Sequence, residues 1–489
     1  MKRSFSLSLL ALLGFVQMVS AQDKQEWKGI FAAINQEVLT NSKAYETLKE
    51  ATEKIGHRLT GFSNGEKAEA FAYNLLKTYG FTNLRYQPFE VESWSRGNIS
   101  VSIGTDTNHL VSIKSVTLAH SPVKADVSNE VVDMGNGLEV DYATNPDKVK
   151  GKIALVYLGV LPGSKEGTKS LHRSEKTAIA TKWGAKGIII INTAKGGILL
   201  TGTASVTGKL IPIPAVCIGL EDGMQLKETI KSKKLYTHIK MNNISGLIKA
   251  RNVIATIKGK SIPNEKIAVG GHLDSWDLAT GAIDNGIGSF AVLDMARTFA
   301  KLKLQPERTV EFILFMGEEE GLLGSKAYVA AAIKDKSIDQ LRYMLNYDMT
   351  NDPKGYSSTD AGSKALFQSI GAIAHNLDTS FSNTFRSGAG LHSDHQPFML
   401  QGVPTGGAAG GKLPNNAGPC YHADCDNFSL VDKPGIQNTV RFNAMLLFGI
   451  ADAKEISAKH FTDAETKEFL LKNNLKEPLQ IAGEWRWKD

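Results

Sequence analysis

Apolar segments with strand character alternate with helical segments over residues 250–455, and this alternation constrains the fold more than any other feature of the sequence. Residues 266–274 (KIAVGGHLD), 308–316 (RTVEFILFM) and 341–349 (LRYMLNYDM) are short and largely apolar, as buried strands are. Helical segments such as 288–302 (GSFAVLDMARTFAKL) lie between them. The pattern predicts an α/β fold in which a mostly parallel, mixed sheet is sandwiched between helices.

Residues 125–245 differ in texture from the rest of the chain. Short β segments such as 187–192 (GIIIIN) alternate there with glycine-rich loops, and one helix is expected at 174–185. This region contains no cluster of His, Asp and Glu. We therefore expect a small β-rich domain at 125–245, inserted into a discontinuous main domain of residues 22–124 and 246–489.

Residues 1–21 are typical of a secretory signal peptide, with Lys2 and Arg3, an apolar stretch and a small-residue cleavage site ending at Ala21. This predicts a secreted or periplasmic protein that is not attached to a membrane after cleavage. The formal net charge is +6, or +4 without Lys2 and Arg3. A charge that is so small and scattered does not predict nucleic acid as a partner.

Metal-ligating side chains follow the predicted strands of the main domain. His272 ends one strand, Glu318 and Glu319 follow the next, and Asp348 follows a third. Because ligands bind beyond the carboxyl ends of parallel strands, we expect these groups to meet at one edge of the sheet. Two further residues in loops complete the candidate ligand set, which comprises His272, Asp284, Glu319, Asp348 and His422.

Imidazole and carboxylate together form a zinc ligand set, and five such groups exceed what one tetrahedral ion needs. They suit two Zn²⁺ ions about 3.5–4 Å apart, with Asp284 as the shared ligand. Cobalt or manganese could occupy the same ligands. The three carboxylates leave one positive charge, which suits a bound hydroxide as the nucleophile.

Neighbouring residues at a strand end point in different directions, so Glu318 can face the attacking water while Glu319 binds metal. We predict Glu318 as the general base. Asp274 is expected to orient His272, and Tyr421 to donate its hydroxyl to the developing oxyanion. Glu320 is expected in solvent. Two further residues, Asp394 and His395, either shape the pocket or cap a helix.

Three cysteines occur in the chain. Cys217 lies in an apolar, strand-like segment and is expected to be buried. Cys420 and Cys425 could close a small loop in an oxidising compartment, whereas a zinc knuckle would need a second Cys/His pair.

Five segments of the sequence resemble the motifs of peptidase family M28 in order and spacing: GGHLDSWD, GAIDNGIG, GEEEGLLGS, NYDM and CYHADCD. The resemblance implies a zinc-exopeptidase fold, a peptide or dipeptide substrate and two zinc ions. It also allows a homodimer. It implies Glu318 as base and the metal ligands His272, Asp284, Glu319, Asp348 and His422.

The inserted region resembles the protease-associated (PA) domain that members of this family carry, through GAKGIIIIN and IPAVCIGLEDG. The segment PCYHADCD is similar to that of secreted bacterial aminopeptidases of the family. That similarity implies that Cys420 and Cys425 are paired and that Tyr421 binds the oxyanion.

These features predict a secreted or periplasmic zinc exopeptidase that uses a metal-bound hydroxide to hydrolyse the terminal peptide bond of peptides or dipeptides, as an aminopeptidase or a carboxypeptidase. One alternative is a glutaminyl cyclase-like enzyme with a single zinc, which would bind one tight metal ion and cyclise N-terminal Gln. Another is a non-catalytic binding ectodomain, which would be inert and free of metal.

Overall fold

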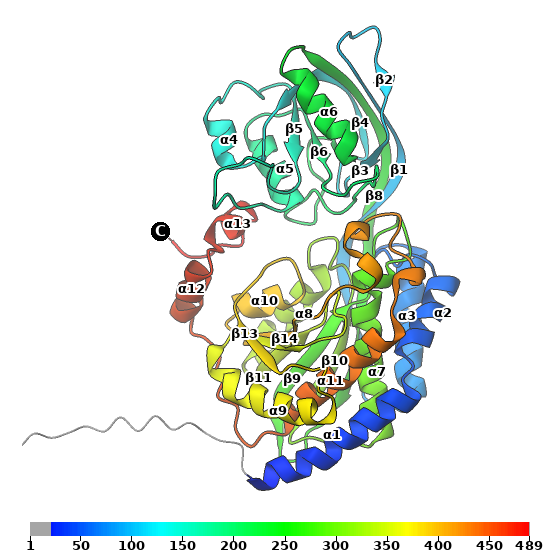
Figure 1. Ribbon diagram of the computed structural model, residues 1–489, viewed down its shortest axis with the longest axis vertical. Coiled ribbons are helices and arrows are strands. Elements are labelled where there is room, and N and C mark those ends of the chain that lie inside the picture. Colours follow the sequence, from blue (N-terminus) through cyan, green and yellow to red (C-terminus); the bar gives the residue numbers. More distant parts are fainter. Residues whose placement is uncertain (1–20, 489) are drawn as a thin grey trace, which may run out of the picture.

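The computed structural model describes residues 21–488 (Figure 1). Within these residues a single mixed sheet of 14 strands runs through both halves of the molecule. Together with the helices that flank the sheet, this confirms the predicted α/β fold. Along its main path the strands follow the order β13, β12, β14, β11, β9, β10, β8, β4, β5, β6, β7, β3.

The strands that carry the predicted ligands are neighbours in the larger half of the molecule. β10 and β11 flank β9 and run parallel to it, and β14 runs parallel to β11. Their carboxyl ends therefore meet at one edge of the sheet, as the sequence predicts. The strands of this half are β9 (Ile262–His272), β10 (Arg308–Phe315), β11 (Leu341–Asn346), β12 (Gly355–Ser358), β13 (Thr384–Ser387) and β14 (Thr405–Ala409).

Helices cover both faces of this part of the sheet (Figure 1). α8 (Leu323–Lys334) and α10 (His395–Leu400) pack on one face through Tyr328 and Phe398. The other face carries the larger apolar cluster and six helices: α1 (Ala21–Asn41), α2 (Ala44–Lys54), α3 (Ser63–Thr78), α7 (Ile287–Lys301), α9 (Lys364–Leu377) and α11 (Lys433–Asp452).

The smaller half is a β-rich unit with two apolar clusters of its own. Its strands β4 (Lys124–Asp133), β5 (Ile153–Tyr157), β6 (Gly187–Ile191) and β7 (Ala215–Ile218) are parallel, and β3 (Ser115–Thr117) pairs antiparallel with β7.

The expectation of one helix in residues 125–245 is wrong, because the structure has three: α4 (Glu139–Ala143), α5 (Arg173–Lys182) and α6 (Leu220–Ile230). α4 is too short to show helical periodicity. The start of α6 overlaps the end of an apolar β segment, which obscures the helix-start signal given by the acidic residues of its first turn.

A long antiparallel ribbon connects the two halves. β1 (Leu84–Gly104) and β8 (Leu235–Ile257) pair along almost their whole length, with one irregularity. One end of β8 pairs with β10 and the other end pairs with β4. Val101 and Ile103, at the outer end of β1, belong to an apolar cluster of the β-rich unit. The short strand β2 (Val111–Ser112) pairs with this same end of β1.

The C-terminal segment contains α12 (Asp463–Lys472) and α13 (Lys476–Ile481), which lie at the left of the molecule in Figure 1, with α13 just below the β-rich unit and α12 beneath α13. Short helical turns complete the elements: η1 (Ala282–Gly286), η2 (Ser337–Gln340), η3 (Ala361–Ser363), η4 (Pro414–Asn416), η5 (Gly418–Cys420) and η6 (Phe428–Leu430).

Among the helices of residues 21–488, none combines the length and the apolar character that crossing a membrane would require. Except for Ala21, where α1 begins, the predicted signal peptide lies outside the described residues.

Candidate active site

His272 is the last residue of β9 and is almost fully buried. Two glycines precede it, and a Cβ on Gly270 or Gly271 would lie within 2.6 Å of a backbone oxygen of a neighbouring segment. These glycines allow the close approach of the chains at this point. Nδ1 of His272 lies 3.1 Å from the carbonyl oxygen of Asp274, which leaves Nε2 directed toward the carboxylates of the site.

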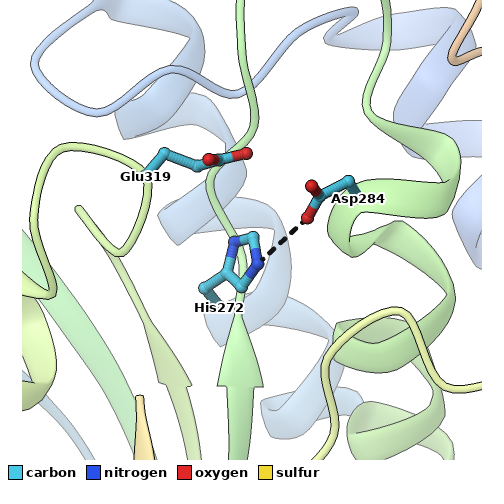
Figure 2. A group of neighbouring side chains, drawn as sticks. All are labelled: His272, Asp284 and Glu319. Carbon is cyan, nitrogen blue, oxygen red and sulfur yellow. Dashed lines mark ion pairs between the residues drawn. The ribbon is translucent and has the colours of Figure 1, made fainter. Parts of the chain in front are cut away.

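Asp284 lies in η1, the turn that connects β9 to α7. Its Oδ1 is 3.3 Å from Nε2 of His272, and its Oδ2 is 3.0 Å from Nε2 of His422. Figure 2 shows the first of these contacts. One carboxylate therefore faces both predicted histidine ligands, which is the placement that a bridging ligand requires.

Glu318 and Glu319 follow β10 in a tight turn, in which the backbone N–H groups of Gly321 and Leu322 both donate to the carbonyl of Glu318 at 2.9 Å. Oε2 of Glu319 lies 3.1 Å from Nε2 of His422. Oε2 of Glu318 is instead directed toward His272, 4.0 Å from its Nε2. The adjacent glutamates thus face different histidines.

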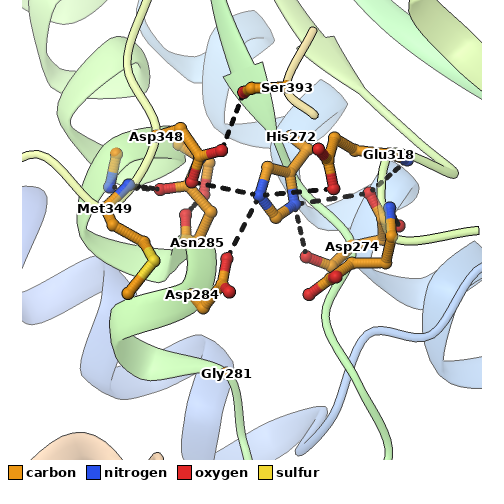
Figure 3. A network of polar contacts seen from close by, with 12 residues as sticks. His272, Asp274, Gly281, Asp284, Asn285, Glu318, Asp348, Met349 and Ser393 are labelled. Carbon is orange, nitrogen blue, oxygen red and sulfur yellow. Dashed lines mark hydrogen bonds and ion pairs between the residues drawn. The ribbon is translucent and has the colours of Figure 1, made fainter. Parts of the chain in front are cut away.

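Asp348 follows β11 on the other side of His272. Its Oδ1 lies 3.4 Å from Nε2 of His272, and its Oδ2 accepts a hydrogen bond of 2.7 Å from the hydroxyl of Ser393 (Figure 3). The side chain of Asp348 is 23% exposed, more than the other four predicted ligands, which are nearly inaccessible. The cluster therefore opens toward solvent near Asp348.

His422 lies in a loop closed by a disulfide between Cys420 and Cys425, and it has a left-handed backbone with φ 53°. The β-rich unit contacts this residue twice. The N–H of Thr201 donates to its carbonyl at 2.9 Å, and Nη2 of Arg173 lies 2.9 Å from its Nδ1. The smaller half of the molecule therefore helps to position a predicted ligand.

The structure brings the five predicted ligands together in two groups that share Asp284. His272 and Asp348 form one group with it, and Glu319 and His422 form the other. His272, Asp284 and Glu319 offer ligand atoms within 4.8 Å of one another, as a shared metal centre requires (Figure 2).

Two oxygen atoms of the cluster, Oε1 of Glu319 and Oδ1 of Asp348, have no hydrogen-bond partner within residues 21–488. Burying a carboxylate oxygen without a partner is costly. Bound cations would compensate this cost, so the residues present fit a metal centre.

The electrostatics of the cluster show how strongly its members interact. Burial, together with the charges of Glu319 and Asp348, holds the pKa of Glu318 well above its ordinary value. Burial alone would lower the pKa of His272, but the surrounding carboxylates raise it well above its ordinary value. Bound cations would reverse both effects, because they favour carboxylate and neutral imidazole.

Asp274 has a different main contact from the one expected. Its backbone oxygen, rather than its carboxylate, lies nearest to Nδ1 of His272; the carboxylate is 3.7 Å away. The carboxylate accepts the backbone N–H groups of Glu318 and Glu319, each at 3.3 Å. Asp274 therefore fixes the turn that carries both glutamates.

The expectation that Glu320 lies in solvent is wrong, because this residue is fully buried. The tight turn after β10 directs its side chain inward, toward the backbone of Trp94 and the carboxylate of Asp274. Burial raises the pKa of Glu320 well above its ordinary value.

Asp394 immediately precedes α10, but its side chain makes no capping hydrogen bond. It is fully buried, and burial raises its pKa to about 7 although His272 lowers it. Nε2 of His395 lies 3.1 Å from the carbonyl oxygen of Gly390.

Tyr421 stacks on His422 with ring centroids 3.8 Å apart, and it lines the cleft described below. Its predicted hydrogen bond to the oxyanion stays a prediction.

Three supporting residues were not identified from the sequence. Arg58 is fully buried and donates to the carbonyl oxygens of Leu273, Thr280 and Gly281, in the loop between β9 and η1. Asn285 accepts the N–H of Met349 at 2.9 Å (Figure 3). Asp426 accepts the N–H of Asp284 at 3.0 Å. The sequence signal for Asp426 was its fixed spacing from His422 at the end of the motif CYHADCD. We used no comparable signal for Arg58.

The cluster lies at the base of a cleft of about 350 Å³. Glu318, Asp348 and Tyr421 line it from the main half, and Arg173 lines it from the β-rich unit. Residues of the C-terminal segment around α13 also line the cleft.

A buried group of imidazoles and carboxylates at the strand ends of an α/β sheet is typical of metal-dependent enzymes. The model of peptidase family M28 matches residues 252–447, and that of the PA domain matches residues 123–226. The chain belongs to peptidase family M28 and is a metallopeptidase of this family.

Relatives of both exopeptidase types are similar to the chain. Carboxypeptidase Q of Mus musculus is 25% identical over 424 residues, covering 85% of this chain and 87% of the relative. A probable leucine aminopeptidase 2 of Trichophyton verrucosum is 30% identical over 366 residues, covering 72% and 68%. The solved structure of a peptidase M28 precursor from Shewanella amazonensis has the same fold, with a TM-score of 0.76, 21% identity and coverage of 90% and 100%.

Proposed function

We propose that the protein is a two-zinc exopeptidase that hydrolyses the terminal peptide bond of peptides or dipeptides. The observation that carries this proposal is the position of Asp284, whose two oxygens face two separate ligand groups. Membership of family M28 supports peptide substrates. Similarity to carboxypeptidase Q and to leucine aminopeptidases supports action at a chain end.

The proposed first zinc ligands are His272, Asp284 and Asp348, and those of the second ion are Asp284, Glu319 and His422. Each set leaves coordination positions for water or substrate, as catalytic zinc requires. Other divalent ions with similar ligand preferences could take the same positions. When bound, the two ions would supply an activated water and polarise the peptide carbonyl.

The chain's own residues would handle the protons and the geometry. Glu318 accepts the proton of the attacking water and passes it to the leaving nitrogen. Tyr421 donates a hydrogen bond to the carbonyl oxygen as negative charge develops there. Asp274 keeps Glu318 and Glu319 in position through their backbone N–H groups.

The substrate is tested with metal-loaded protein and matched peptides that are free at both ends, blocked at the N-terminus or blocked at the C-terminus. Hydrolysis of unblocked peptides with release of terminal residues is expected. Loss of cleavage on blocking one end assigns the end that the enzyme recognises. A single tight metal ion, with cyclised N-terminal Gln as the product, would contradict the proposal in favour of the glutaminyl cyclase-like alternative.

Glu318 provides the sharpest test of the mechanism. Glu318→Gln preserves the shape of the side chain but removes the base, so turnover should fall by at least about 10²-fold. Metal content should not change, because Glu318 is not a proposed ligand. Turnover and bound metal are measured on the same sample. Turnover close to that of the wild type would exclude Glu318 from the mechanism.

We also propose that the protein is secreted or periplasmic and that residues 1–21 are removed. The disulfide between Cys420 and Cys425 supports this location, since such bonds persist in oxidising compartments. N-terminal sequencing of exported protein is expected to begin at Gln22.

The domain division is likewise a proposal, with a PA domain at 125–245 inserted into a catalytic domain of residues 22–124 and 246–489. The PA-domain match over residues 123–226 supports the core of the inserted domain.

We also propose that the protein forms a homodimer, as the family resemblance allows. The mass of the purified protein in solution tests this proposal.

A further inference from the structure

We propose that the C-terminal segment 476–484, termed the end wall, closes one end of the substrate cleft and restricts the enzyme to short peptides. The inference rests on the proposed exopeptidase function and adds a limit on substrate length. It is carried by the position of the end wall, its anchors to both halves of the molecule, and the size of the cleft.

The end wall lines the same cleft as the candidate catalytic groups. Pro478, Leu479, Ala482 and Glu484 line the same cavity as Glu318 and Asp348. In Figure 1, α13 lies next to the β-rich unit, above α12 and beside the gap between the two halves. The segment therefore borders the cleft on the side of α13.

The end wall is held to the main half by charge and by apolar packing. Glu484 forms an ion pair of 2.7 Å with Nζ of Lys326 on α8 and accepts a hydrogen bond of 2.6 Å from Nε2 of Gln396 on α10. Leu479 is fully buried and clusters with Leu400 and Leu470. These contacts make the segment a fixed part of the molecule.

The end wall also contacts the β-rich unit. Ile481 packs against the apolar cluster of that unit, which also receives Tyr421 from the main half. The segment thus spans from one half to the other beside the cleft. A substrate extending past this point would have to displace contacts on both sides.

The size of the cleft agrees with a short substrate. Its volume of about 350 Å³ is near the lower limit for small-molecule pockets, which is about 300 Å³. A dipeptide or tripeptide can be held in a space of this size. Each further residue on the side of α13 would need an open path, which the end wall obstructs.

The test compares kcat/KM for peptides of two, three, four and six residues that share the same terminal residues. For the wild type, kcat/KM should fall at least about tenfold from the dipeptide to the hexapeptide, because the longer chain loses its fit in the cleft. Glu484→Lys replaces the ion pair with a repulsion against Lys326 and should bring this ratio to within about threefold.

A second variant and a matched control complete the test. Leu479→Ala removes the buried side chain that borders the cleft, and it should also narrow the ratio. Glu477→Lys makes the same charge change on α13 at an exposed residue that does not line the cleft, and it should leave the ratio unchanged. Hydrogen exchange of residues 476–484 reports whether each variant loosens the end wall.

The outcomes separate this inference from the proposed function. Equal hydrolysis of peptides of all lengths by the wild type would contradict the proposed length restriction by the end wall. It would not contradict the proposed exopeptidase function. The same holds if neither variant alters the ratio. Failure of the metal-loaded wild type to hydrolyse any peptide would overturn both proposals.

Discussion

Single residues outside the proposed ligand set support the geometry of the proposed metal centre. Asp426 accepts the N–H groups of Ile283 and Asp284 at 2.8 and 3.0 Å, and so fixes the turn from which Asp284 projects. Such outer contacts orient ligands and contribute to metal affinity. We therefore expect the proposed function to depend on residues outside the proposed ligand set.

This dependence predicts that Asp426→Ala weakens zinc binding by about 10–100-fold, because the turn that presents Asp284 loses its acceptor. Zinc affinity is measured by competition with a coloured chelator. Asp424→Ala is the matched control, since Asp424 lies in the same loop but is exposed, and its affinity should equal that of the wild type. Unchanged affinity in the Asp426 variant would contradict the role assigned to it.

Because His120 is buried, we expect the free energy of unfolding to decrease in acid. His120 is fully buried, and burial lowers its pKa to about 4. The folded state therefore keeps the ring neutral while the unfolded state, with a pKa near 6.5, takes up a proton. The free energy of unfolding is therefore unaffected by this group above about pH 6.5. It decreases by about 3 kcal/mol as the pH falls toward 4, because only the unfolded state takes up the proton.

The measurement is the free energy of unfolding between pH 4 and 7 for the wild type and for His120→Asn. Asn tolerates the left-handed backbone at this position, where φ is 65°. The variant should show a flatter acid dependence. Parallel curves for the two proteins would show that His120 does not titrate on unfolding.

Among the structural elements, the loop that carries His422 combines a left-handed backbone with a covalent closure. The disulfide between Cys420 and Cys425 closes a short loop, and loops of this size gain about 2 kcal/mol from such a bond. Because His422 lies inside the loop, the stability of the loop also affects the ligand.

Reduction of this disulfide should therefore lower the melting temperature and weaken metal binding. Both are measured with and without dithiothreitol. The double variant Cys420→Ser, Cys425→Ser serves as the control, since it should start at the reduced values and should not respond to the reductant. An equal response of the double variant would show that the reductant acts by a route other than this disulfide.

The elements of the main half could be predicted from the sequence, whereas several turns could not. The strands ending at His272 and at Phe315 are distinct because their apolar segments are short and each is followed by polar ligands. The inward position of Glu320 could not be predicted, because it depends on the tight turn after β10. A turn of that kind leaves no periodic pattern.

On the scale of the whole molecule, the proposed metal centre links distant parts of the chain. Its carboxylates crowd together, and without cations their repulsion opposes folding. A metal ion that binds only to the folded state raises the free energy of unfolding by about 2.7 kcal/mol when its free concentration is 100 times its Kd.

Removal of metal with a chelator should consequently lower the melting temperature, and two equivalents of Zn²⁺ should restore it. Calorimetry and metal analysis on the same samples measure both quantities. Glu318→Gln should behave like the wild type, whereas Asp284→Asn should lose the response. Saturation at one equivalent would contradict the two-ion centre.

The clustering of His272, Glu319 and Asp348 followed from one rule, that parallel strands place their carboxyl ends at a common edge. The contact of Arg173 with His422 joins residues from two halves that are 249 positions apart in sequence. No periodicity or spacing connects such residues. For the same reason the position of the end wall could not be predicted from the sequence, because its contacts with α8 and α10 form only in the folded molecule.

The ribbon of β1 and β8 also limits how this architecture can be rearranged. Each strand belongs to the hydrogen-bonded sheet of both halves, and the register runs from Leu84 opposite Ala255 to Gly104 opposite Tyr236. The smaller half is therefore not a cassette that can be cut out at its termini and exchanged. A graft from another protein would have to bring both strands in matching register, or it would leave an open edge beside β10.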